Sequence, residues 1–201
     1  KEGKKPDSIY VTGNTAIDAL KTTVRESYTH PELEWAKDSR LIMITAHRRE
    51  NLGEPMCHMF KAIRRVMDEH PDVKAIYPIH MNPAVRETAN EYLGNDDRIH
   101  IIEPLDVLDF HNFLSRSYLI LTDSGGIQEE APSLGKPVLV MRDTTERPEG
   151  IAAGTLKLVG TEEETIYKEF SRLLSDKDEY EAMSKASNPY GDGHACERIA
   201  D

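Results

Sequence analysis

A glycine-rich loop, Thr122–Gly126, carries residue types whose spacing could bind phosphate. It follows an apolar run and precedes a helical stretch. Gly125 and Gly126 permit close approach to the backbone, and exposed amides at the start of a helix favour anions. The alternative is a tight strand-to-helix turn capped by Ser124, and on these residues alone both remain open. The spacing matches neither the dinucleotide-binding glycine fingerprint nor the P-loop lysine motif.

Glu129 and Glu130 lie in the first turns of the helix expected after this loop. Acidic side chains interact favourably with the N-terminal end of a helix dipole, and this is the simpler explanation for both. One of the two carboxylates could instead accept hydrogen bonds from ribose hydroxyls, as the acidic residue of a nucleotide site does.

The segment Ala46–Asn51 places five polar or ionisable residues directly after another apolar run. His47 could contact a diphosphate or transfer a proton. The neighbouring arginines could hold phosphate or pair with acids. A solvated loop with internal salt bridges is the alternative, but the position of this segment at the end of a predicted strand favours a functional role.

His80 ends another predicted strand and is expected on the same rim as His47. Two histidines suggest a metal site, but no third ligand occurs at metal-ligand spacing and there is no His-Glu-x-x-His motif. The sequence therefore predicts no metal and no cofactor. The other histidines are expected to be structural or exposed.

The segment 143–150 follows a further predicted strand and is long for such a loop. Arg147, beside Pro148, could aim a positive group at the same crevice. It could equally pair with Glu146 or Glu149.

Phe110 lies in a predicted helix, three residues before Phe113. An aromatic ring in this helix could stack on a nucleobase or pack in the core. The core is the expected place for one of the two.

Apolar strands alternate with amphipathic helices around all of these loops. The predicted strands are 41–45, 73–79, 99–102, 118–122, 137–141 and 156–159. The predicted helices are 14–28, 55–69, 83–93, 106–116, a short one ending at 134, 162–174 and 179–186. Fully apolar strands separated by helices indicate a doubly wound, Rossmann-like α/β fold with a parallel sheet covered on both faces. Ligands in such folds bind beyond the carboxyl ends of the strands, which is where the polar loops lie.

Composition excludes several classes of partner. The 201 residues are 38% hydrophobic and carry a net charge of -11, which disfavours nucleic acid and anionic membrane as main partners. No apolar run is long enough to span a bilayer. Cys57 and Cys196 form neither a metal-type pair nor a disulfide framework, which favours a cytoplasmic location.

The polar loops, taken together and in order, resemble the motifs of the non-hydrolysing UDP-N-acetylglucosamine 2-epimerases, most closely those of Gram-positive bacteria. The resemblance covers nearly all of the chain. The matching stretches are Val11–Thr15, Ala46–Asn51, Leu121–Ala131, Arg142–Glu149 and Asn188–Gly193.

The resemblance implies two Rossmann-like domains in the glycosyltransferase-B arrangement, usually in a homodimer. Residues 1–14 are then expected to cross from an N-terminal domain and residues 15–187 to form the UDP-binding domain. Residues 188–201 would begin a segment that returns to the N-terminal domain. A chain that begins at Lys1 and stops at Asp201, inside a predicted helix, is expected to be part of a longer protein.

The resemblance also implies which residues meet the substrate. Glu130 would hold the ribose hydroxyls, while Phe110 and the backbone near Leu105 border the uracil. Leu105 stands where some relatives carry a polar residue. His47 takes the catalytic role and faces the phosphates or the reacting sugar. The expected substrate-binding residues are His47, Leu105, Phe110, Ser124, Gly125, Gly126, Glu130 and Arg147.

The implied activity is the reversible conversion of UDP-GlcNAc to UDP-ManNAc for cell-surface polysaccharide synthesis. UDP is eliminated across C1–C2 to give 2-acetamidoglucal and is then added back. The sugar-side acid and base belong to the N-terminal domain of the family, so this chain is expected to bind UDP weakly and not to epimerise alone. Arg48 and His80 match positions that contact a second, allosteric UDP-GlcNAc in bacterial members.

Other functions remain open. A retaining glycosyltransferase of the same architecture also holds a nucleotide-sugar in its C-terminal domain. A hydrolysing epimerase would release a product without UDP. A non-catalytic nucleotide-binding module would tolerate replacement of His47 and Arg147.

Overall fold

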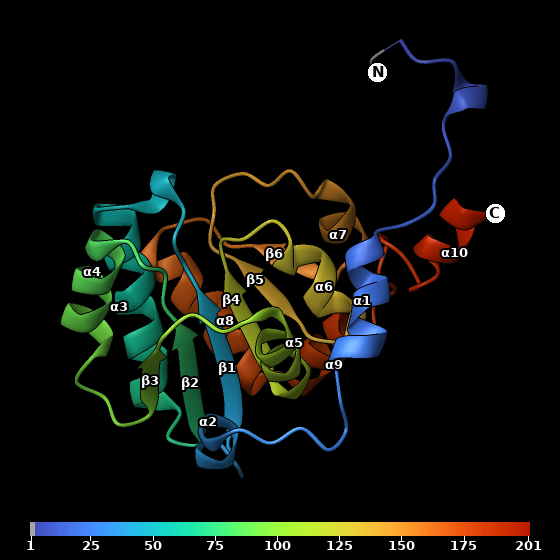
Figure 1. The fold of residues 1–201 in the computed structure, drawn as a ribbon. Helices are drawn as coiled ribbons and strands as arrows, with labels where there is room; N and C mark the ends of the chain where they lie inside the picture. Colours follow the sequence, from blue (N-terminus) through green and yellow to red (C-terminus); the bar gives the residue numbers. More distant parts are fainter. Residues whose placement is uncertain (1–2) are drawn as a thin grey trace.

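The sheet determines where every loop of this chain lies. The computed structural model describes residues 3–201, and six parallel strands pair in the order β3-β2-β1-β4-β5-β6 (Figure 1). The strands are β1 (Arg40–Thr45), β2 (Val73–Pro78), β3 (Ile99–Ile102), β4 (Leu119–Thr122), β5 (Val138–Val140) and β6 (Leu156–Leu158). In the register, Ile42 is opposite Ala75 on one side and Leu119 on the other. The strands therefore lie where the apolar runs predicted them.

Helices cover both faces of this sheet (Figure 1). They are α1 (Thr15–Thr23), α2 (Pro31–Trp35), α3 (Glu54–Glu69), α4 (Pro83–Leu93), α5 (Val107–Arg116), α6 (Ile127–Ser133), α7 (Pro148–Ala153), α8 (Glu163–Ser175), α9 (Lys177–Ser184) and α10 (Ala195–Ala200). Side chains of β1 alternate between two cores, because successive residues of a strand point to opposite faces. Ile42 and Ile44 pack with α3, α4 and α8, whereas Leu41 and Met43 pack with α5 and α6.

The strand order reverses at β1. The chain runs outward from β1 through β2 to β3, then crosses back to β4 on the other side of β1. At the carboxyl ends of these two central strands, the hydroxyls of Thr45 and Thr122 share a hydrogen bond of 2.6 Å. Because the chain leads from β1 to β2 on one side and from β4 to β5 on the other, the loops after β1 and β4 border a crevice. The predicted doubly wound, Rossmann-like class is confirmed.

The first helix is shorter than the predicted 14–28. It ends at Thr23, and Val24 is already extended (φ -77°, ψ 123°). The hydroxyls of Thr22 and Thr23 both donate to the carbonyl of Ala19, and β-branched residues favour helices less than straight side chains do. The next amide, Arg25 N, then donates to a side chain of α5 rather than continuing the helix.

The expected loop 143–150 contains the start of a helix, α7, that was not predicted. Pro148 occupies its first turn, where a missing amide hydrogen costs nothing, and Gly154 ends it in the left-handed conformation (φ 78°). Six residues are too few to show a helical period in the sequence. The short helix α2 was missed for the same reason.

The segment that leads into α1 contacts the C-terminal segment near α10, and residues 3–14 extend away from the sheet (Figure 1). The amide of Asn14 donates to the carbonyl of Tyr190 over 2.9 Å. Asp18 of α1 accepts hydrogen bonds from the first two amides of α10, and the bond from Cys196 is the largest cause of its lowered pKa. That residues 1–14 and 188–201 cross to another domain remains a prediction, and residues 1–2 of that segment lie outside the described residues.

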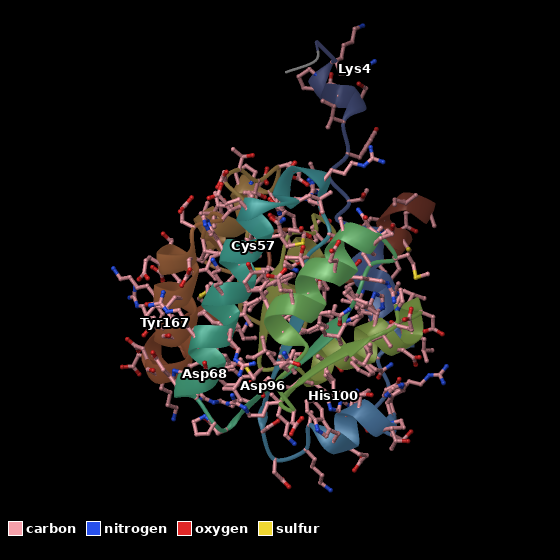
Figure 2. The ribbon with its side chains drawn as sticks, turned by 90° about the vertical axis from the view of Figure 1, so that its left-hand side faces the viewer. Lys4, Cys57, Asp68, Asp96, His100 and Tyr167 are labelled. Carbon is pink, nitrogen blue, oxygen red and sulfur yellow. The ribbon has the colours of Figure 1, made fainter. Side chains whose placement is uncertain are left out.

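Asp68 and Asp96 lie near the end of α3 (Figure 2), and both pair with arginines. The Asp96 carboxylate accepts hydrogen bonds from the amide and the guanidinium of Arg98, and Asp68 pairs with Arg64. Burial raises the pKa of Asp96, but the hydrogen bonds from Arg98 outweigh it, so this pKa lies below its usual value.

Across residues 3–201, no three His, Cys, Asp or Glu side chains are grouped to hold a metal ion. Within the same residues, no helix has the length and apolar character that a membrane crossing requires.

The packing of α8 on α3 gives a test of this core. Phe170 of α8 is fully buried, so Phe170→Ala removes a ring and leaves a cavity that should lower the free energy of unfolding by about 3–5 kcal/mol. The exposed neighbour Lys168 provides the control, since Lys168→Ala should change it by less than about 0.5 kcal/mol. Urea denaturation of both variants measures the difference. Equal effects would contradict this packing.

Candidate functional site

A cavity of about 480 Å³ opens beyond the carboxyl ends of β1, β2 and β4. It lies at the reversal of strand order, where the fold predicts a ligand. Residues expected from the sequence line much of it: His47, His80, Leu105, Phe110, Ser124, Gly126 and Glu130. Gly125, Arg48 and Arg147 lie outside this lining.

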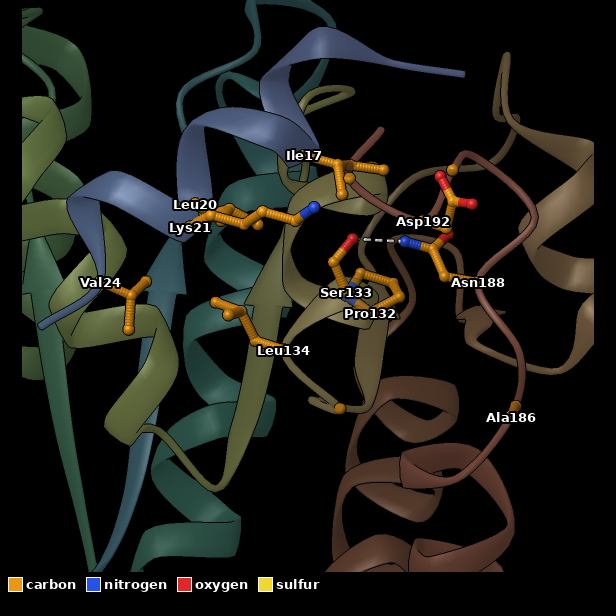
Figure 3. Close-up of a pocket in the computed structure, with 13 residues that line it drawn as sticks. Ile17, Leu20, Lys21, Val24, Pro132, Ser133, Leu134, Ala186, Asn188 and Asp192 are labelled. Atoms are coloured by element: carbon orange, nitrogen blue, oxygen red, sulfur yellow. Dashed lines mark hydrogen bonds between the residues drawn. The ribbon is translucent and has the colours of Figure 1, made fainter. Parts of the chain in front are cut away.

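A second cavity, of about 610 Å³, lies between α1, the end of α6 and the segment 186–193 (Figure 3). Its walls include Ile17 and Leu20, and the Asn188 amide crosses it to donate to the Ser133 hydroxyl over 2.5 Å. The end of α6 leads into β5, so this cavity is at the opposite end of α6 from the glycine loop. It contains none of the residues that the sequence singled out for chemistry.

The wall formed by α5 and α6 is apolar at one end and acidic at the other. Phe113 is fully buried in the core, whereas Phe110 is partly exposed and lines the cavity beside Leu105. The expectation that one of the two phenylalanines belongs to the core is therefore confirmed. Glu130 is also on this wall, with one carboxylate oxygen 3.7 Å from Nε2 of buried His111. An apolar ring next to a carboxylate suits a ligand with a flat base and hydroxyl groups.

The glycine loop forms the floor between this wall and β1. The amide of Ser124 donates to the Thr122 hydroxyl over 2.9 Å, which turns the chain sharply at the end of β4. Gly126 then begins α6 in helical conformation (φ -64°, ψ -42°). At Gly126, which lines the cavity, the nearest atom to the position of a Cβ is a Glu130 oxygen at 3.8 Å, so the backbone there is open to a close ligand contact.

Asp123 holds the loop that carries His47. One of its carboxylate oxygens, Oδ2, accepts hydrogen bonds from the amides of His47 and Arg48 at 2.8 Å each, and from the Asn51 side chain at 3.1 Å. The Arg48 guanidinium donates to the backbone carbonyl of Asp123. No role for Asp123 was predicted, because the sequence places its loop at the rim but does not show which side chain there would hold the loop after β1.

His47 and His80 lie face to face across this rim. Their ring centroids are 5.2 Å apart and their planes differ by 6°. Nδ1 of His80 accepts a hydrogen bond from the amide of Asn82, which orients this exposed ring. The two histidines therefore share the rim as expected.

Arg147 is turned toward Glu129 rather than into the cavity. Its Nε donates to Oε1 of Glu129, and the side-chain amide of Asn14 donates to Oε2 of the same glutamate. The side chain of Asn188 donates to the backbone carbonyl of Glu129 over 3.0 Å. The ion pair expected for Arg147 with Glu146 or Glu149 is thus made with Glu129. A substrate contact by Arg147 remains a prediction.

Arg48 lies behind the glycine loop with a partner that the sequence did not reveal. Its guanidinium contacts one oxygen of Glu146 at 3.1 Å, while buried Arg142 contacts the other at 2.5 Å. Burial raises the pKa of Glu146, but hydrogen bonds and the charges of Arg142 and Arg48 outweigh burial, so this pKa lies below its usual value. A Cβ at Gly125 would lie 2.6 Å from this carboxylate, so only glycine fits beside it without a shift.

The six-stranded order and the cavity at its reversal define a Rossmann-like α/β domain with a ligand site at the switch point. The model of the UDP-N-acetylglucosamine 2-epimerase family matches residues 1–201. The chain therefore belongs to this family.

Relatives agree with this assignment. A UDP-N-acetylglucosamine 2-epimerase of Bacillus subtilis is 66% identical over 201 residues, which is all of this chain and 53% of the relative. A co-structure of the S. aureus protein MnaA with UDP has 58% identity and a TM-score of 0.97, covering 99% of this chain and 55% of that one. The UDP-GlcNAc 2-epimerase of Neisseria meningitidis, solved with UDP-GlcNAc, has 43% identity and a TM-score of 0.91, covering 99% and 56%. This chain thus spans about half the length of these relatives.

A more distant likeness concerns the fold alone. The C-terminal domain of a group 1 glycosyl transferase from Francisella tularensis has a TM-score of 0.63 at 16% identity, covering 89% of this chain and 97% of that one. The predicted likeness to one half of a glycosyltransferase-B fold is therefore confirmed, but this similarity assigns no transferase activity.

The contact of Arg147 with Glu129 can be tested by stability. Glu129 is buried, so Arg147→Ala leaves its carboxylate short of a partner and should cost about 2 kcal/mol, less than a fully buried pair because the arginine is partly exposed. Arg49→Ala, in an exposed position of the neighbouring rim, should cost less than about 0.5 kcal/mol. Urea denaturation measures both. If the two variants were equally stable, the ion pair would not contribute to the fold.

Proposed function

We propose that this chain is the UDP-binding part of a non-hydrolysing UDP-N-acetylglucosamine 2-epimerase. The observation that carries the proposal is that one cavity is lined by Phe110, Glu130, His47 and two residues of the glycine loop, Ser124 and Gly126. These groups suit the three parts of UDP, which are the uracil, the ribose and the diphosphate. The cavity volume lies in the range that suits a ligand of this size.

Each group has a chemical reason for its place. The uracil would stack near Phe110 and Leu105, and the Glu130 carboxylate would accept hydrogen bonds from the ribose hydroxyls. The diphosphate would meet the open backbone of Ser124, Gly125 and Gly126. UDP and UDP-GlcNAc bound in the structures of close relatives support this assignment.

The reaction we propose is reversible exchange between UDP-GlcNAc and UDP-ManNAc. The C1–O bond breaks with its electron pair going to UDP, a proton leaves C2, and 2-acetamidoglucal results. UDP is then added back after C2 has been protonated on the other face. Within this chain, the glycine-loop amides and His47 would stabilise the departing diphosphate. The sugar-side acid and base would come from a domain outside this chain.

Regulation and assembly are part of the same proposal. Arg48 and His80 would contact a second, allosteric UDP-GlcNAc, and the complete protein would be a cytoplasmic homodimer that supplies surface polysaccharide synthesis. Arg147 would move from Glu129 to the phosphates or the reacting sugar. The contacts of the rim histidines and of Arg48 with groups next to the cavity support these roles.

The proposal is tested by calorimetric titration of the chain with UDP, with ADP as the control ligand. UDP should bind at least about tenfold more tightly than ADP, because the cavity end at Phe110 admits a pyrimidine. Ser124→Trp should abolish saturation by filling the cavity floor. Ser175→Trp adds the same ring at an exposed site near the amino end of β1, away from the cavity, and should leave binding unchanged. Equal affinity for UDP and ADP would contradict the proposal.

The role of Glu130 is tested with 2′-deoxy-UDP. The chain should bind UDP about tenfold more tightly than the deoxy ligand, because a charged acceptor loses a hydroxyl partner. Glu130→Gln should reduce this preference to about threefold or less. Glu162→Gln, in an exposed position before α8, should retain it. An unchanged preference in Glu130→Gln would remove Glu130 from the ribose site.

A further inference from the structure

The carboxylate of Asp123 is buried and only half satisfied. Its exposed fraction is 0%, and its Oδ2 oxygen accepts three hydrogen bonds from the loop after β1. The other oxygen, Oδ1, has no hydrogen-bond partner among the described residues. A buried carboxylate oxygen without a donor is costly, so this orientation calls for an explanation.

The group that faces Oδ1 is the imidazole of His47. Nδ1 of that ring lies 3.6 Å from Oδ1. A movement of the ring by less than about 1 Å would give a normal hydrogen bond, and such contacts often tighten only when ligand binds. The same carboxylate therefore holds the backbone of His47 with one oxygen and faces its side chain with the other.

Neighbouring groups contact both the backbone before His47 and its ring. The carbonyl of Ala46, the residue before His47, accepts a hydrogen bond from the buried Tyr77 hydroxyl. Burial, and then the charge of Asp123, raise the pKa of Tyr77, which keeps this hydroxyl a donor. On the cavity side, His80 lies parallel to the His47 ring. The two rings are parallel, and the Nδ1 edge of His47 faces Asp123.

We propose that Asp123 is a positioning residue for His47. Its Oδ1 accepts a hydrogen bond from Nδ1–H, which fixes the tautomer and leaves Nε2 as the nitrogen that faces the cavity. This role rests on the proposed function, because Nε2 then meets the diphosphate of UDP. Asp123 itself does not touch the ligand; it acts through the histidine.

The tautomer is measured by NMR of the chain labelled with ¹⁵N-histidine at alkaline pH. The His47 signals are assigned by their loss in His47→Gln. In the unsubstituted chain they should show the Nδ1–H form, and Asp123→Asn should move them toward the Nε2–H form. Asp143→Asn is the matched control, since this exposed acid also follows a parallel strand, β5, but contacts Thr161. An Nε2–H form in the unsubstituted chain would overturn the proposal, even if Asp123→Asn failed to fold.

Calorimetry on the same samples separates this inference from the function on which it rests. Asp123→Asn should weaken UDP binding about tenfold, and Asp143→Asn less than twofold. UDP binding together with an Nε2–H form would overturn the positioning role and leave the function standing. An Nδ1–H form in a chain that does not bind UDP would support the hold of Asp123 on His47 and contradict the proposed function.

Discussion

The pairing of β1 with β4 is the constraint on which the site depends. These strands are far apart in the sequence, yet Thr45 and Thr122 are opposite each other in the register. That pairing brings the loop with His47 against the loop with Asp123 and the glycines. Because apolar cores cover both faces of the sheet, neither strand can slide without exposing its core side chains to water. The carboxyl ends of β1 and β4, where the loops of the cavity begin, are therefore fixed relative to each other.

Three arginines near the site are already paired. Arg147 contacts Glu129, and Arg48 and Arg142 share the carboxylate of Glu146. In a chain with net charge -11, this leaves backbone amides and the rim histidines as the groups of the cavity lining that can meet an anion. A bound diphosphate would therefore compete with Glu129 and Glu146 for these arginines.

The sequence predicted the strands and longer helices because burial imposes a period on apolar residues. It also predicted which loops gather at the rim, since parallel strands place their carboxyl ends together. It did not predict partners: Arg147 was expected to aim at the crevice or to pair with Glu146 or Glu149, and in the structure it pairs with Glu129. Such choices depend on distances between elements, which a single sequence does not contain. Helix α7 was missed because six residues show no period.

The contact between the two ends of the chain has a mechanical consequence. Asn14 holds Tyr190 through its amide and Glu129 through its side chain, and Asn188 reaches the backbone of the same glutamate. Glu129 in turn holds Arg147. A displacement of the segment that contains Asn14, or of the segment that contains Asn188, would therefore act on Glu129 at the start of α6. Because Glu129 holds Arg147, the same displacement would change the position of this arginine beside the cavity.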